Sequence, residues 1–355
     1  MTRWKRTLAP ILAEAYIEKG GYMGSVCIIA EIGVNHNGDY ALAEKMILAA
    51  RDAGANVVKF QTEKPQLITS QYAPKADYQL EITNKQESQL AMLEKLMFDY
   101  EVFGGLKKFC DENAIIFATS PFGIPCLEYL TGLDLPFIKI PSGEITNLPY
   151  IIEIAKFKKP VILSTGMSEM HEIENAIAVL QKYGANEITL LHCNTQYPTP
   201  FVDVNLRAME TLRKTFGLPV GYSDHTVGIE VPIAAVAMGA TVIEKHFTLD
   251  RNMQGPDHKA SMEPGDFATM VKAIRNIEIA LGDGKKGVTS SEKGNKVVAR
   301  KSIVASRPID KGETFTTENI TTKRPGNGIS PMRWFDILGE NAKRDFAYDE
   351  LIEVD

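Results

Sequence analysis

The stretch VIEKHFT, residues 242–248, begins as a buried strand and ends in polar side chains. Its first two residues are apolar and β-branched, which favours an extended backbone. Glu244, Lys245 and His246 then follow without a break. A carboxylate, an ammonium and an imidazole at one strand end indicate a fold in which the ends of strands carry the chemistry.

Short apolar runs of the same kind recur along the chain. They are VCIIAEIG (26–33), VVKFQT (57–62), IIFATS (115–120), FIKIPSG (137–143), VILSTG (161–166), ITLLHCN (188–194), VGYSDH (220–225) and TVIEKHFT (241–248). Most segments between them have the periodicity of helices. Ile173, Ile177 and Leu180, for example, fall at i, i+4 and i+7. Ser168 is the expected N-cap of this helix, and Gly184 is expected to end it.

The alternation of strands and helices predicts an α/β fold. Eight strand-then-helix units in roughly 260 residues predict a (β/α)8 TIM barrel. An open, doubly wound sheet is the alternative, but no Gly-x-Gly-x-x-Gly turn follows the first run. The segment KPQLITSQYAPKADYQLEITNKQESQ, residues 64–89, is too polar and turn-rich for one helix. We place it at the barrel mouth, because long loops on this fold are usually functional.

Several of the predicted strands end in polar residues. Those residues are Glu31, Lys59, Gln61, Thr119, Ser120, Lys139, Ser142, Glu144, Ser164, Thr165, His192, Asn194, Ser223, Asp224, His225, Glu244, Lys245 and His246. The carboxyl ends of barrel strands build the active site of this fold. The sequence therefore predicts that these side chains converge at the barrel mouth.

The overall composition limits the classes of partner. The chain of 355 residues is 44% hydrophobic and 24% charged, with a formal net charge of -6 and a pI near 5.7. It lacks the basic surplus that a nucleic-acid or anionic-membrane surface needs. Its four cysteines are widely spaced, without a Cys-x-x-Cys pair. This argues against a disulfide framework or cysteine-ligated zinc, and favours a reduced, cytoplasmic setting.

Residues 1–24 are expected to form an N-terminal extension outside the fold. The segment starts with basic residues, but Glu14 interrupts its apolar run, so it lacks the apolar core of a signal peptide. No stretch of the chain approaches the ~20 apolar residues that a membrane-spanning helix requires.

Histidines and lysines at strand ends have a structural and a functional interpretation. A single strand-end histidine is more often a hydrogen-bonded structural residue than a metal ligand, but His225 and His246 end consecutive runs. His192 lies within its run and is expected to be packed. Lys59 and Lys139 follow apolar residues, where an unpaired ammonium is unfavourable to bury. Each is expected to meet a carboxylate or an anionic ligand, and two lysines at one mouth favour the ligand.

Nine motifs give the chain a family resemblance. In order they are AEIGVNHNG, KFQT, IKIPSGE, STGM, LHCNTQYPTP, GYSDHT, IEKHFTLD, GPDHKAS and KRPGNGISP. Together they resemble the sialic acid synthase family, which comprises N-acetylneuraminate synthases and their legionaminic and pseudaminic acid relatives. The resemblance covers residues 26–355 and keeps the motifs in order and in register.

The resemblance implies two domains. It implies a TIM-barrel synthase domain over residues 25–282 and a small antifreeze-like (SAF, β-clip) domain over residues 297–355. The Gly-, Lys- and Ser-rich stretch between them, residues 283–296, is expected to be a linker. The family also implies a domain-swapped homodimer, in which the SAF domain of one subunit reaches the barrel of the other.

The resemblance also implies a reaction. The family condenses phosphoenolpyruvate with an N-acetylated hexosamine, here expected to be N-acetylmannosamine, and water. The products are a nine-carbon 2-keto sugar acid and phosphate. A divalent metal, typically Mn²⁺ with Mg²⁺ or Co²⁺ as alternatives, is expected on His225 and His246. Glu31 matches the base that activates water, and Glu144 matches a residue close to the metal or the intermediate.

Further positions match the substrate contacts of the family. The expected phosphoenolpyruvate contacts are Lys59, Ser120, Lys139, Ser142, Ser164, Asn194, Thr195 and Ser223. The expected sugar contacts are Gln61, Tyr197, Asp257 and Arg324. Arg324 would contact the N-acyl group from the partner subunit. Lys245 is expected to form a structural ion pair with Glu244.

Three alternatives remain open at this stage. Many N-acetylneuraminate synthases have LHCTNxYP where this chain has LHCNTQYP, so Thr195 replaces the usual Asn. The variant also occurs in legionaminic-type enzymes, which use a 6-deoxy-diacetamido hexose. A Schiff-base aldolase would use Lys59 or Lys139 and no metal. A non-catalytic sugar-binding protein is the last alternative, although Glu31 and both histidines are present.

Overall fold

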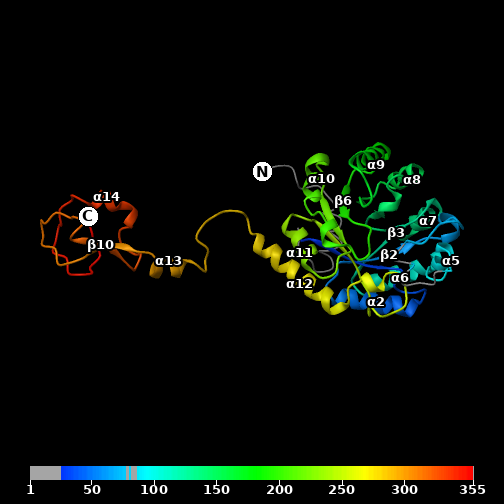
Figure 1. Ribbon diagram of the computed structural model, residues 1–355, viewed down its shortest axis with the longest axis horizontal. Coiled ribbons are helices and arrows are strands. Elements are labelled where there is room, and N and C mark those ends of the chain that lie inside the picture. Colours follow the sequence, from blue (N-terminus) through cyan, green and yellow to red (C-terminus); the bar gives the residue numbers. More distant parts are fainter. Residues whose placement is uncertain (1–24, 77–79, 81–85, 355) are drawn as a thin grey trace. The chain divides into compact units, whose positions relative to one another are not determined.

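The computed structural model describes residues 25–76, 80 and 86–354. The chain packs as two compact units, of which one ends at Gly282 and the other comprises Asp283–Asp355 (Figure 1). Each unit has its own hydrophobic core. The expected N-terminal extension, residues 1–24, lies outside the described residues.

The first unit is built on eight parallel strands. They are β1 (Cys27–Gly33), β2 (Val57–Thr62), β3 (Ile116–Pro121), β4 (Ile138–Ile140), β5 (Val161–Ser164), β6 (Ile188–Cys193), β7 (Val220–Asp224) and β8 (Val242–His246). Hydrogen bonds join them in the order β3-β2-β1-β8-β7-β6-β5-β4, and β3 and β4, at the two edges, also lie against each other. Each strand begins and ends within three residues of its predicted run. The predicted TIM barrel is confirmed.

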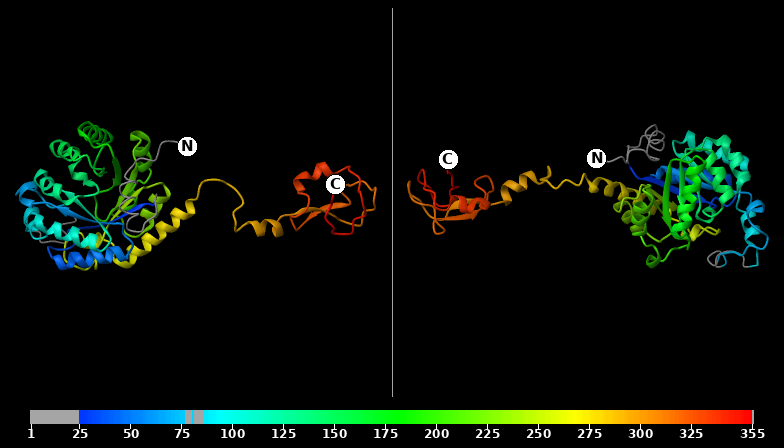
Figure 2. Two further views of the ribbon diagram at one scale, coloured as in Figure 1. Left: turned by 180° about the vertical axis from the view of Figure 1, so that it is seen from behind. Right: turned by 90° about the horizontal axis from the view of Figure 1, so that it is seen from above.

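Helices surround the strands, as Figures 1 and 2 show. They are α2 (Tyr40–Asp52), α6 (Tyr100–Glu112), α7 (Ile124–Leu130), α8 (Leu148–Lys156), α9 (Met170–Tyr183), α10 (Ala208–Phe216), α11 (Glu230–Ala237) and α12 (Pro264–Leu281). Helices adjacent in sequence pack side by side, for example α8 on α9, and α12 returns to pack on α2. Over the ranges that the structure describes, every helix is too short or too polar to cross a bilayer.

Helix α9 shows how local sequence sets a helix and its limits. The three apolar residues of its predicted stripe are buried, and the helix ends at Gly184 with a φ of 121°, where a side chain would be strained. The expected N-cap, Ser168, is wrong: the N-cap is Glu169. The carboxylate of Glu172 accepts a hydrogen bond from the backbone N–H of Glu169 at 2.8 Å, which starts the first turn one residue later.

The barrel interior changes from apolar to polar along the strands. Successive residues of a strand point alternately outward and inward. The inward residues toward the amino ends form one apolar cluster: Ile29, Val57, Ile116, Ala118, Phe137, Ile162, Leu191 and Val242. Gly221 lies among them without a side chain, because a Cβ there would meet the carbonyl oxygen of Val242 at 2.4 Å. The next inward positions are polar, so the site residues rest on a closed apolar floor.

Short helices occupy the long segment between β2 and β3. They are α3 (Pro65–Ile68) and α5 (Gln89–Glu94), and residues 77–79 and 81–85 lie outside the described part. The segment leaves the carboxyl end of β2, on the side of the barrel where it was expected. The described residues also form the 3-10 helices η1 (Thr131–Leu133), η2 (Ser142–Glu144), η3 (Phe201–Asp203), η4 (His258–Ala260) and η5 (Pro331–Arg333).

The second unit contains short strands and turns. Strands β9 (Ser302–Ala305) and β10 (Ile320–Lys323) pair antiparallel, and the helices are α13 (Lys293–Ala299) and α14 (Trp334–Ile337). Its core consists of Ile303, Ala305, Ile309, Phe315, Ile320, Ile337, Ala342, Phe346 and Ile352. Helix α13 crosses the linker boundary expected at residue 296.

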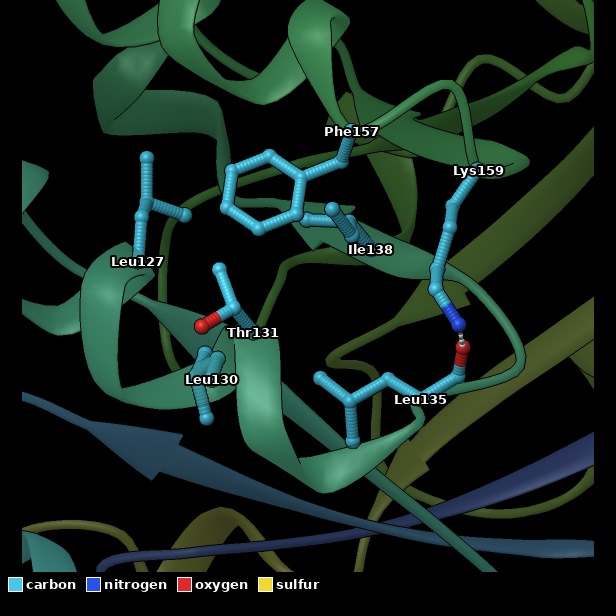
Figure 3. A pocket seen from close by; sticks show the side chains of 7 residues that line it. All are labelled: Leu127, Leu130, Thr131, Leu135, Ile138, Phe157 and Lys159. Atoms are coloured by element: carbon cyan, nitrogen blue, oxygen red, sulfur yellow. Dashed lines mark hydrogen bonds between the residues drawn. The ribbon is translucent and has the colours of Figure 1, made fainter.

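An apolar cavity of about 70 Å³ lies beside the amino end of β4, away from the carboxyl ends of the strands (Figure 3). Its lining residues are Leu127, Leu130, Thr131, Leu135, Ile138, Phe157 and Lys159. The Lys159 Nζ donates to the carbonyl oxygen of Leu135 at 2.7 Å and pairs with Asp134 at 2.9 Å. Because its one cation is already paired, this cavity lacks the convergent polar groups of an active site.

Candidate active site at the carboxyl ends of the barrel strands

The polar residues that end the strands meet at one end of the barrel. Strand pairing sets Glu31 of β1 beside Lys59 of β2 and beside His246 of β8. Gln61 of β2 lies beside Ser120 of β3 in the same way. Apart from the half-buried Gln61, each of these residues is at most 7% exposed. Polar groups buried this deeply require partners.

Two lysines and two glutamates form a buried ion cluster across the mouth. The Lys59 Nζ lies 2.6 Å from Glu31 Oε2 and 3.9 Å from Glu244 Oε2. The Lys139 Nζ lies 3.5 Å from Glu244 Oε1, to which Ser223 Oγ also donates at 3.0 Å. Both lysines therefore meet carboxylates. Glu244 joins the two lysines, a role that the sequence analysis missed.

The cluster shifts the pKa values of its two carboxyls in opposite directions. Burial raises the pKa of Glu31 to about 7, against the opposing effect of the Lys59 ammonium. Burial also acts to raise the pKa of Glu244, but Lys139 and Lys59 outweigh it and lower that pKa to about 2. Glu244 is therefore the permanent anion of the cluster. Glu31 is the carboxyl whose protonation can change near neutral pH.

The two lysines also differ. Burial lowers the pKa of Lys139. Burial acts in the same direction on Lys59, but Glu244 and Glu31 outweigh it, so the pKa of Lys59 is raised.

Glu244 and Lys245 do not pair with each other, and the expected ion pair is wrong. Adjacent residues of a strand point to opposite faces, so Glu244 enters the barrel while Lys245 faces the helices. Lys245 forms its ion pair with Asp224 of β7. Its Nζ also donates to the carbonyl oxygen of Thr226 at 2.5 Å.

His225 and His246 come together beside this cluster. Their ring centroids are 5.3 Å apart. The ring of Tyr197 packs on both, with centroids 4.1 Å from His225 and 5.4 Å from His246. Burial lowers the pKa of His225 to about 4 and that of His246 well below its usual value. Both imidazoles are therefore neutral at pH 7, the form that binds a metal.

The hydrogen bonds of these rings leave nitrogen atoms for a metal. His225 Nδ1 lies 2.6 Å from the carbonyl oxygen of Asn194, so Nδ1 carries the proton and Nε2 keeps its lone pair. His246 Nδ1 has no hydrogen-bond partner within the described residues, and Asp257 Oδ2 is 3.9 Å away. The described part of the chain contains no cluster of three His, Cys, Asp or Glu groups suited to a metal. A metal on the two imidazoles would therefore complete its shell with water or substrate oxygen.

The expected phosphoenolpyruvate contacts lie around the ion cluster. Lys59 Nζ donates to Ser120 Oγ at 2.9 Å, and Lys139 Nζ donates to Ser164 Oγ at 2.8 Å. Two ammonium groups and two hydroxyls thus occupy one small region. Such a set of donors fits a phosphate or carboxylate group.

Gly166 brings further members of this set together. Its backbone N–H donates to Ser142 Oγ at 3.0 Å. A Cβ on Gly166 would meet Ser142 Oγ and Thr195 Cγ2 at 2.9 Å, so any other residue there would have to displace these two side chains. Asn194 holds His225 through its carbonyl oxygen, and its side chain accepts from the N–H of Gln196 at 2.7 Å.

The expected sugar contacts divide between the two units. Gln61 Nε2 donates to Glu31 Oε1 at 3.2 Å. Asp257 is buried near His246, and burial raises its pKa to about 6. Arg324 belongs to the second unit, where it is exposed and its Nε donates to the carbonyl oxygen of Ala299 at 3.1 Å. Its role at a barrel stays a prediction.

Two carboxyls lie near the mouth outside the ion cluster. Glu144 is half-buried, and Asn147 Nδ2 donates to its Oε2 at 2.6 Å. Glu63, which the sequence analysis missed, is 4% exposed, and its Oε1 is buried with no hydrogen-bond donor in the described ranges. Burial, with a smaller effect from Glu144, raises the pKa of Glu63 to about 7. Glu63 continues the two-residue spacing of Lys59 and Gln61, and this spacing is the sequence signal that could have identified it.

Comparisons with known proteins agree with this arrangement. The model of the NeuB family matches residues 46–286, and that of the SAF domain matches residues 300–353. The N,N'-diacetyllegionaminic acid synthase of Campylobacter jejuni subsp. jejuni serotype O:2 is 52% identical over 93% of this chain and 99% of its own. The synthase of that name from Legionella pneumophila is 43% identical over 90% and 91%. The crystal structure of N-acetylneuraminic acid (sialic acid) synthetase from Leptospira borgpetersenii is 37% identical, with a TM-score of 0.68 over 76% of this chain and 90% of that one.

Proposed function

The chain belongs to the NeuB family, and we propose that this enzyme is an N,N'-diacetyllegionaminic acid synthase. In the proposed reaction, phosphoenolpyruvate, water and a 6-deoxy-diacetamido hexose give a nine-carbon 2-keto sugar acid and phosphate. The observation that carries the choice of sugar is the 52% identity to the Campylobacter jejuni enzyme over nearly its whole length. The sialic acid synthetase shares 37%. The higher identity favours the 6-deoxy-diacetamido hexose, the alternative raised by Thr195, over N-acetylmannosamine, the sugar first expected.

Phosphoenolpyruvate is proposed to bind at the lysine and serine donors of the barrel mouth. Lys59 and Lys139 approach Glu244 from β2 and β4, and each also holds a serine hydroxyl. An anionic ligand can take over hydrogen bonds from these hydroxyls and ammonium groups without a basic surface elsewhere. This reconciles the net charge of -6 with a strongly anionic substrate.

Glu31 is proposed as the base that takes a proton from the attacking water. Its two carboxylate oxygens are fixed, one by Lys59 and the other by Gln61. Burial raises its pKa to about 7, and a base is most effective when its pKa lies near the working pH. Glu144 is the second candidate for this role.

His225 and His246 are proposed to hold a divalent metal, with Mn²⁺ as the first choice and Mg²⁺ or Co²⁺ as alternatives. When bound, the metal supplies a Lewis acid for the aldehyde oxygen of the sugar. The chain contributes two neutral imidazoles, one of them oriented by the carbonyl oxygen of Asn194. Tyr197 packs against both rings.

The enzyme is proposed to work as a homodimer in which the SAF domain of one subunit covers the barrel of the other. Support comes from exposed apolar residues on the segments that follow the strands: Leu67, Ile124, Leu148, Met167, Met170, Phe201, Val202 and Val227. Such a concentration around one end of a barrel favours a protein partner there. Arg324 of the partner would then contact an N-acyl group of the sugar.

Turnover with two sugars tests the proposed substrate. The enzyme is incubated with phosphoenolpyruvate, Mn²⁺ and either N-acetylmannosamine or its 6-deoxy-diacetamido analogue, and phosphate release is measured. We expect kcat/KM to be at least about tenfold higher for the diacetamido sugar, since buried polar groups that lose a substrate partner discriminate strongly. A preference for N-acetylmannosamine would return the assignment to sialic acid. Trapping of pyruvate by borohydride, unaffected by a chelator, would instead support the Schiff-base aldolase.

A further inference from the structure

Behind the candidate metal site lies a buried ion pair that the proposed chemistry does not use. Asp224 and Lys245 face each other where β7 and β8 end, as the last pair of the ladder between the two strands. Their side chains are 0% and 2% exposed. Lys245 Nζ donates to Asp224 Oδ2 and to the carbonyl oxygen of Thr226 at 2.5 Å. Asp224 in turn accepts from the N–H and Oγ1 of Thr226 at 3.0 and 2.9 Å.

The sequence places each candidate metal ligand directly after one member of this pair. His225 follows Asp224, and His246 follows Lys245. Because side chains alternate along a strand, the pair faces the helices while both imidazoles face the barrel interior. Thr226, which lies on the other side of His225, is bound by both members of the pair. The backbone that carries His225 is therefore fixed on both sides of the ligand.

We propose that Asp224 and Lys245 are positioning residues that set the separation and orientation of His225 and His246 for a divalent metal. The inference rests on the proposed metal site and goes one step beyond it. His225 directly follows β7, His246 is the last residue of β8, and the two share no hydrogen bond in the described structure, so their spacing depends on how β7 and β8 end. The ion pair holds those two strand ends together at the last position before the ligands.

A purely structural role makes a different prediction. A buried ion pair contributes little net stability, because the desolvation of two charges offsets their attraction, whereas one charge left alone is strongly destabilising. Asp224→Asn and Lys245→Met should each lower the melting temperature, since each leaves a buried partner uncompensated. The double variant Asp224→Asn/Lys245→Met removes both charges and should recover most of that stability. Metal affinity then separates the two roles.

Mn²⁺ alone, without substrates, is the probe, and free Mn²⁺ is counted by its electron paramagnetic resonance signal. The wild-type protein should bind Mn²⁺, and His246→Ala should not. Loss of a residue that orients a metal ligand typically weakens binding by about 10- to 100-fold. We expect that loss in both single variants and in the double variant, where the recovered stability does not restore the affinity. If the single variants fail to fold, the double variant alone decides.

Arg275→Met is the control for loss of an ion pair away from the candidate site. Arg275 Nη1 donates to the carbonyl oxygen of Val26 at 2.9 Å and pairs with Glu278 at 3.0 Å, beside the amino end of β1. Its loss should lower stability and leave Mn²⁺ affinity unchanged. Wild-type Mn²⁺ affinity in the stable double variant would overturn the positioning role and leave the metal site intact. Absence of Mn²⁺ binding by the wild type would overturn the metal site itself, whatever the sugar turnover shows.

Discussion

Single residues at the barrel mouth divide into fixed charges and groups that can change protonation. Glu244 stays ionised because two lysines hold its pKa at about 2. Glu31 and Glu63 are buried carboxyls whose pKa values are raised to about 7. Asp257 is a third such group, with a pKa raised to about 6. The first two lead to separate predictions, one on catalysis and one on stability.

Glu31→Gln should lower turnover by roughly 10²- to 10⁴-fold, the usual contribution of a general base. The amide keeps the shape of the side chain but cannot accept the proton of water. Binding of phosphoenolpyruvate, measured by calorimetry, should change little, because Lys59 and Lys139 remain. Glu144→Gln is the parallel variant. Near-normal turnover in Glu31→Gln together with a large loss in Glu144→Gln would transfer the role to Glu144.

Glu63→Gln should reduce the pH dependence of stability. The pKa of Glu63 in the folded state, about 7, lies above its ordinary value of 4.5. The folded protein therefore binds this proton more tightly, and its stabilising effect is complete below pH 4.5 and lost as pH rises through 7. From pH 4.5 to pH 8, the free energy of unfolding of the wild type should fall by up to about 3 kcal/mol more than that of the variant. Urea denaturation at several pH values measures this, and parallel curves would contradict it.

At the scale of elements, the spacing of β7 and β8 depends on a residue without a side chain. A Cβ on Gly221 of β7 would lie 2.4 Å from the carbonyl oxygen of Val242 and 2.7 Å from Leu191 Cδ2. A backbone carbonyl cannot move without its strand, so a methyl group on residue 221 must displace β7. His225 follows β7 directly and His246 is the last residue of β8, so a displacement of β7 changes the position of one histidine relative to the other.

Gly221→Ala should therefore lower the free energy of unfolding by about 1–3 kcal/mol, the usual effect of overpacking a core. Activity per folded molecule should fall as well. Gly265→Ala in α12 is the control, because a Cβ there meets nothing within 4 Å. Urea denaturation and turnover on the same samples measure both effects. Equal stability of the two variants would show that β7 has room for the methyl group.

At the scale of the whole molecule, the question is what the SAF domain contributes. The SAF domain, expected over residues 297–355, has a small core, and domains below about 70–80 residues gain only modest stability from packing. Arg324 precedes Pro325 in a Pro- and Gly-rich turn, which holds the backbone stiffly and lets the guanidinium project. These features support the proposed docking of the domain on the barrel of a partner subunit.

Arg324→Ala should raise the KM for the sugar far more than the KM for phosphoenolpyruvate, because the proposed contact is to the N-acyl group. Truncation after Gly282 should have the same effect, more severely. Steady-state kinetics with each substrate varied in turn measures the two constants. Equal increases in both would indicate a general loss of structure.

Mixed dimers test whether the contact comes from the partner subunit. After subunit exchange, heterodimers of Arg324→Ala and Glu31→Gln should contain one intact site, with Glu31 from one chain and Arg324 from the other. Activity should therefore exceed that of either parent. Verified heterodimers without recovered activity would mean that the domain serves its own barrel or does not reach the site.

Local sequence patterns were enough to predict the strands and the polar residues that end them. Apolar β-branched runs and helical periodicity are local patterns, so all eight strands were predicted within three residues. Convergence of Glu31, Lys59, Lys139 and the two histidines also followed, because the carboxyl ends of parallel barrel strands share one side.

Which of these groups are partners depends on the folded barrel and could not be predicted from local patterns. Lys245 pairs with Asp224 rather than with its neighbour Glu244, because the pleat turns adjacent side chains to opposite faces and the register sets β7 beside β8. Glu244 meets Lys59 and Lys139 across the barrel, and the raised pKa of Glu63 arises from burial. These contacts join residues far apart in the chain. They exist only once the strands have closed in one register and excluded water, which no local pattern encodes.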